Sequence, residues 1–143
     1  MTLASCKTTM NDSSKNRIDN IQLAVAAIDG TYLAVWDYFS FNDIVGPRTA
    51  SYGYANALNG RGVKVMGGGV AQVASTLYLA LKQIDALTTV EKPTYAHYTD
   101  NYVASKKHAI AVEHTAGVVL RHRNDDRRQG TVDVGGSRRC SHA

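Results

Sequence analysis

Apolar positions between residues 70 and 84 recur three and four residues apart, which is the spacing of one face of an α-helix. The members of this repeat are Val70, Val73, Leu77, Leu81 and Ile84. The positions between them are mostly apolar as well, so the pattern predicts a helix buried near the middle of the domain. Over 15–29 the apolar residues fall on one face only, which predicts an amphipathic helix that Gly30 ends.

The remaining segments have the composition of strands and turns. Strands are predicted over 31–42, 62–66, 88–91, 109–112 and 118–122, a turn over 43–48, and a short helix over 51–58. The last two strands are predicted to be joined as in a hairpin. Helices and strands do not alternate regularly, so the predicted fold is α+β, with the buried helix packed on a mostly antiparallel sheet.

The chain has 143 residues, which is the size of one domain. We expect the domain to occupy residues 1–125, and residues 126–143, rich in Arg, Gly and Ser, to form a disordered tail. The net charge of +4 comes from the end of the chain, because residues 1–120 hold ten basic and nine acidic side chains. A nucleic-acid groove is therefore not predicted. Neither a membrane-spanning segment nor a signal peptide is predicted.

Three glycines, at positions 67–69, lead directly into the buried helix. Backbone N–H groups at such a helix start can hold a phosphate, a carboxylate or a developing oxyanion, and they lower the pKa of a cysteine placed there. The first helical turn carries Ala71 instead of a cysteine. A tight turn with no space for side chains explains the glycines equally well. The spacing of a nucleotide-binding P-loop is absent.

Five segments, in order along the chain, resemble the VanW family of bacterial cell-envelope proteins. They are residues 16–21 (NRIDNI), 39–42 (FSFN), 45–49 (VGPRT), 53–57 (GYANA) and 67–78 (GGGVAQVASTLY). The last segment is similar to the family pattern G-G-G-V-C-Q-V-S-[ST]-T-L-Y and differs from it at Ala71 and Ala74. The resemblance extends from about residue 3 to residue 125.

This resemblance implies an exported protein of the cell envelope or the extracellular space. Some VanW members are L,D-transpeptidases, which cross-link the stem peptides of peptidoglycan, and the cysteine of the pattern is the implied nucleophile. Such a cysteine attacks an amide carbonyl, while backbone N–H groups stabilise the oxyanion. The implied partner is a stem peptide or another wall fragment, without a cofactor or a metal.

The chain departs from the family pattern where this chemistry would occur. Ala71 replaces the cysteine, Tyr95 stands at a position where the family has histidine, with His97 two residues on, and His108 stands where the family has aspartate. We therefore predict a catalytically inactive relative of the transpeptidases. The alternative is a non-catalytic accessory module that binds wall peptide or glycopeptide. Several departures together favour natural drift over an engineered Ala71.

The candidate site is centred on Ala71, with His97 and Glu91 as candidate lining. The candidate ligand-binding residues are Gly68, Gly69, Gln72, Ser75, Arg48 and Asn42.

Each candidate also has a structural interpretation. Ser75 could bond a backbone carbonyl of its own helix. Arg48 could bind a carboxylate of a ligand or pair with an acidic residue of the domain, namely Asp37, Asp43 or Glu91. Asn42 could bind a ligand or only its own turn. The spacing of His97, His108 and His114 matches no compact metal site.

Overall fold

A computed structural model describes residues 3–10, 12–95, 102–113, 117–123 and 132–133. The helices are α1 (Lys15–Ile28), α2 (Phe41–Val45) and α3 (Val70–Leu81), with 3₁₀ turns η1 (Ala50–Tyr52) and η2 (Lys106–His108). The strands are β1 (Tyr32–Leu33), β2 (Tyr38–Ser40), β3 (Asn56–Leu58), β4 (Lys64–Met66), β5 (Leu87–Glu91), β6 (Val119–His122) and β7 (Val132–Asp133).

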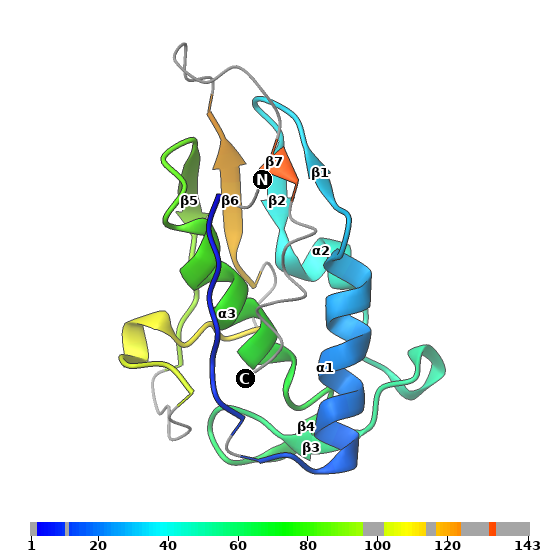
Figure 1. Cartoon of the computed structure of the whole chain (residues 1–143). Helices are drawn as coiled ribbons and strands as arrows, with labels where there is room; N and C mark the ends of the chain where they lie inside the picture. The colour runs from blue at the N-terminus through cyan, green and yellow to red at the C-terminus, as the bar shows by residue number, and fades with distance from the viewer. Residues whose placement is uncertain (1–2, 11, 96–101, 114–116, 124–131, 134–143) are drawn as a thin grey trace.

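The described strands form three small antiparallel sheets. In the largest sheet β6 lies between β2 and β5, while β3 pairs with β4 and β1 with β7. Figure 1 shows the β3–β4 hairpin at one end of the molecule and the β2–β6–β5 sheet toward the other, with α1 and α3 between them. The predicted α+β class is therefore confirmed, but the strands do not form one continuous sheet.

Helix α3 is the centre of the core, as its apolar sequence predicts. All of its residues except Leu79 are buried. The segment before α1 runs alongside α3 (Figure 1), where the hydroxyls of Thr8 and Thr76 lie 2.8 Å apart. The amide of Gln72 donates to the Thr8 hydroxyl at 2.9 Å. The helix ends at Leu81, three residues before the last apolar position of the repeat.

Three local predictions are wrong. The 109–122 region is not a hairpin: β6 pairs with β2 and β5, and Ile110 makes only an isolated bridge to Thr94. The segment predicted as a short helix over 51–58 is a 3₁₀ turn followed by β3. The predicted strand over 31–42 is interrupted, and its end starts α2, because the buried Phe41 turns inward and Gly46, at φ +76°, ends that helix.

The segment predicted as a disordered tail contributes one short strand. Val132 pairs with Leu33 and Asp133 with Tyr32. The other residues of 126–143 lie outside the described residues, as does His97. Among the described helices, none has the length and apolar character needed to span a membrane.

Candidate functional site at the start of helix α3

The glycine turn between β4 and α3 is enforced by close packing. A Cβ on Gly68 would lie 1.9 Å from the carbonyl oxygen of Ala57, which belongs to the neighbouring strand. Gly67 and Gly69 have φ of +82° and +104°, and a Cβ on either would approach an arginine side chain within 3.0 Å. Steric exclusion thus accounts for all three glycines.

Helix α1 holds this turn from behind through buried polar side chains. Asn20, fully buried, donates to the carbonyls of Ala55 at 2.8 Å and Gly68 at 2.9 Å, and accepts from the Ala55 N–H at 3.0 Å. Arg17, 1% exposed, donates to the Leu58 carbonyl at 3.4 Å. The N-R-x-x-N segment therefore holds the glycine turn and β3 through hydrogen bonds to their backbone groups.

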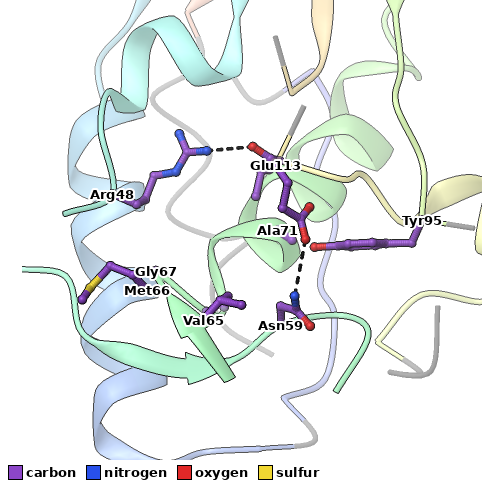
Figure 2. A pocket seen from close by; sticks show the side chains of 11 residues that line it. Arg48, Asn59, Val65, Met66, Gly67, Ala71, Tyr95 and Glu113 are labelled. Atoms are coloured by element: carbon purple, nitrogen blue, oxygen red, sulfur yellow. Dashed lines mark hydrogen bonds between the residues drawn. The ribbon is translucent and has the colours of Figure 1, made fainter. Parts of the chain in front are cut away.

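In front of the turn lies a small pocket with a volume of about 60 Å³, room for one or two water-sized groups. Ala71 lies at its wall, as Figure 2 shows. Its lining residues are Arg48, Asn59, Val65, Met66, Gly67, Gly68, Gly69, Ala71, Tyr95, Val112 and Glu113. Four of them also line a broader open groove of about 680 Å³, which extends along Asn42 and Asp43.

Arg48 stands where the pocket and the groove meet. Its guanidinium donates to two backbone carbonyls, those of Gly46 at 3.0 Å and Val112 at 2.8 Å. Burial lowers the pKa of Arg48, an effect that nearby Tyr54 and Glu113 oppose. Among the described residues, it forms no ion pair with any of the three carboxylates proposed as its partners. Arg48 therefore fixes the loop of α2 to the backbone at Val112.

Tyr95 and Glu113 face each other across the mouth of the pocket (Figure 2). Burial, followed by the charge and the hydrogen bond of the Glu113 carboxylate, strongly raises the pKa of Tyr95, so its hydroxyl stays protonated and can donate. The carboxylate also accepts from the Asn59 amide at 3.4 Å and lies 3.9 Å from the Arg61 guanidinium. These contacts are long, and Glu113 is 40% exposed.

Comparison with known proteins identifies the family. The family model described as "VanW like protein" matches residues 16–137. The chain belongs to the VanW family. It is also 42% identical, over 77 residues, to the uncharacterized protein YoaR of Bacillus subtilis (strain 168). That match covers 52% of this chain and 25% of YoaR, so the chain spans about a quarter of that relative. No solved structure matches the chain.

The structure brings together four of the residues that the VanW pattern predicts for the site. Ala71, Gly68, Gly69 and Arg48 all line the pocket. Asn42 lines the adjoining groove, where its amide donates to the Val112 carbonyl at 3.1 Å.

Two other predicted residues of the VanW pattern point elsewhere. Ser75, fully buried, donates to the Ala71 carbonyl at 2.9 Å and accepts from the Ile110 N–H at 2.8 Å, so its hydroxyl serves the core. The Gln72 side chain reaches the segment before α1 instead of the pocket.

The remaining candidates are not brought to the pocket by the described structure. Glu91 is exposed at the end of β5 and is not among the lining residues. His108 Nε2 lies 3.1 Å from Lys82 Nζ, also away from the pocket. Asn59 and Glu113, by contrast, were missed by sequence reasoning, since each is an isolated polar residue without a motif around it. Tyr95 was noticed only through the family pattern.

Proposed function

We propose that this VanW domain is a cell-envelope module related to the peptidoglycan L,D-transpeptidases, and that it binds wall peptide without cross-linking it. The observation that supports this proposal is the position of Ala71, at the wall of a pocket lined by Arg48, Asn59, Tyr95 and Glu113. A methyl group cannot attack a carbonyl, and Ser75 is engaged within the core.

The surroundings suit the chemistry that the missing thiol would perform. The N–H groups of Val70 and Gln72 donate to the Gly67 and Gly69 carbonyls at 3.1 Å, so the start of α3 acts on a thiolate or an oxyanion mainly through the positive end of the helix dipole. Tyr95, at the position of the family's histidine, is a poor base because burial and the nearby carboxylate keep its phenol protonated. Among its described lining residues the pocket thus holds neither a nucleophile nor a histidine.

The groove beside the pocket is the proposed binding site for the peptide ligand. Its volume of about 680 Å³ accommodates several peptide residues, while the pocket at Ala71 admits only a small group. In this arrangement a stem peptide lies along Asn42 and Arg48 and directs one small side chain or carbonyl toward α3.

A cross-linking assay with purified stem peptides tests the proposal. The unmodified domain is expected to yield no cross-linked dimer, while binding of the peptide is detected by isothermal titration calorimetry. The Ala71→Cys variant restores the nucleophile, and the double variant Ala71→Cys, Tyr95→His adds a base beside it. Dimer formation by the unmodified domain would contradict the assignment, as would the absence of peptide binding.

The second candidate function is an accessory binding module whose pocket was never catalytic. The pKa of an introduced thiol separates the two, measured from the pH dependence of labelling in a Cys6→Ser, Cys140→Ser background. A thiol at Ala71 is expected to react with a depressed pKa, whereas a control thiol at the exposed Ala26 reacts with an ordinary one near 8.5. Equal pKa values at both positions would favour the accessory role.

A further inference from the structure

Two exposed aromatic side chains and an arginine form a cluster that is separate from the pocket. Trp36 and Tyr38 are 52% and 56% exposed. The guanidinium carbon of Arg121 lies 5.0 Å from the centre of the Trp36 ring and 5.1 Å from that of Tyr38. The turn from β1 to β2, which carries Trp36, lies at the opposite end of the molecule from the β3–β4 hairpin (Figure 1). We call these three residues the aromatic–arginine site.

The sheet holds this cluster in a fixed geometry. Tyr38 and Arg121 are direct partners in the β2–β6 pairing. Beside them, His122 is buried and its ring lies 3.1 Å from the Leu33 carbonyl. Tyr38 and Arg121 therefore project from paired strands, which limits the reorganisation needed before a ligand binds.

Arg121 is a cation with unused bonding capacity. Within the described part of the chain it forms no ion pair, and its buried Nε has no hydrogen-bond acceptor. Stacking on two rings occupies the planar faces of a guanidinium, whereas its N–H groups point outward in the plane, away from the rings. An anionic group in that plane would complete the site.

Trp36 occupies a backbone conformation that would suit glycine. Its φ is +73°, the only positive value among the described non-glycine residues. The Asp37 N–H donates to the Ala34 carbonyl at 3.0 Å, which closes a turn with Trp36 at the position where positive φ normally selects glycine. The Trp36 N–H also donates to the His122 carbonyl at 2.6 Å. Strain retained at an exposed aromatic residue points to a role in binding.

We propose that the aromatic–arginine site binds a carbohydrate ring that carries a carboxylate. The apolar face of a pyranose packs on an exposed aromatic ring, and the guanidinium pairs with the carboxylate in its own plane. Stacked aromatic and arginine side chains also occur in proteins that bind single-stranded nucleic acid. However, Arg121 is the one cation that the described structure places on these two rings, and a single cation supplies little attraction for a polyanion. This site is separate from the pocket and does not depend on the function proposed for it.

Trp36 is the only tryptophan of the chain, so intrinsic fluorescence reports on the site directly. The domain is titrated with trigalacturonic acid, with neutral maltotriose and with an oligothymidylate of the same charge. The acidic trisaccharide is expected to change the emission and to bind at least about tenfold more tightly than the neutral one, since only it supplies a carboxylate. Stronger binding of the oligothymidylate would overturn the proposal.

Variants distinguish binding from folding, with affinity measured by calorimetry. Trp36→Gly relieves the backbone strain, so the unfolding midpoint is expected to stay level or rise while affinity falls at least about tenfold. Arg121→Gln is expected to abolish the preference for the acidic sugar. Tyr52→Ala, which removes a comparably exposed ring on η1, serves as the control and is expected to bind normally. Unchanged affinity in Trp36→Gly, or unchanged preference in Arg121→Gln, would also overturn the proposal.

Discussion

Two polar networks contact the same glycine turn from opposite sides, and they are built differently. Behind the turn, Asn20 and Arg17 are buried and bond to backbone groups. In front, Glu113 faces Asn59 at 3.4 Å and Arg61 at 3.9 Å, and both members of the ion pair are more than a third exposed. The rear network bonds to the backbone, whereas the front network adds the exposed side-chain contacts of Glu113 to the backbone bonds that Asn59 accepts from Arg61 and Val63.

This difference shows where the sequence can change without loss of the fold. Backbone carbonyls buried by the turn need donors in every sequence that adopts it, so the rear residues are constrained by stability. In front, the exposed contacts of Glu113 contribute little to stability, so this residue can change at small cost to the fold. The two departures that matter for chemistry, Ala71 and Tyr95, both line the front pocket.

The largest expected effect comes from filling the turn itself. Gly68→Ala places a methyl group against the Ala57 carbonyl, a backbone atom that cannot move aside, and is expected to cost about 3 kcal/mol or more in the free energy of unfolding. Gly30→Ala is the control, because Gly30 has a positive φ but open space around it. Its cost is expected to be only about 1 kcal/mol. Urea denaturation measures both, and equal costs would show that steric exclusion does not define the turn.

A smaller loss is expected from cutting the rear network. Asn20→Ala removes three hydrogen bonds, including those of the Ala55 N–H and the Gly68 carbonyl, for a loss of about 2–3 kcal/mol. The matched control is Asn56→Ala on an exposed position, expected within about 0.5 kcal/mol of the parent. Thermal unfolding at fixed pH measures the difference.

The front network is expected to respond weakly. Glu113→Gln removes the charge facing Arg61, and since exposed ion pairs contribute little, the free energy of unfolding should change by less than about 1 kcal/mol. The measurement is urea denaturation at low and moderate salt. If Glu113→Gln lowered the free energy of unfolding as much as Asn20→Ala, the two networks would not differ in their contribution to stability.

The smallest effect concerns His108, which lies outside both networks. Slight burial and then the charges of Lys82, Lys107 and Lys92 lower its pKa below the ordinary value near 6.5. Because the unfolded chain binds the proton more readily, the contribution of this group to stability falls as the pH drops below about 6.5, and it is absent above that value. Titration by NMR should place this pKa below 6.5, and Lys82→Gln should raise it. An unchanged pKa in that variant would contradict the role of Lys82.

Local patterns predicted the elements whose burial is set by nearby residues. Helices α1 and α3 and strands β4 and β5 lie where periodicity and composition placed them. Strand pairing was not accessible in this way, because β6 joins β2, about eighty residues earlier, instead of its neighbour in sequence. The same limit explains the wrong hairpin, since Gly117 marks a turn but does not identify the partner strand.

For the site, the family pattern located the turn, Ala71 and Arg48. It did not distinguish Gln72 and Ser75, which belong to the same segment but point into the core. Sequence spacing tells which face of a helix a residue occupies, but not what covers that face. Glu113 was missed for the complementary reason: a single charge after an apolar run acquires meaning only when the fold brings Tyr95 and Asn59 beside it.

The segment that lies along α3 has a consequence for how the chain acquires its structure during synthesis. Thr8 leaves the ribosome 68 residues before Thr76, the partner of its buried hydroxyl. Until α3 has been synthesised, the segment around Thr8 has no partner. Once α3 has emerged, the side of α3 that this segment covers stays exposed until the segment packs against it. Its polar, weakly structured sequence suits this delay, because a segment that formed stable local structure first would have to unfold before it could close the core.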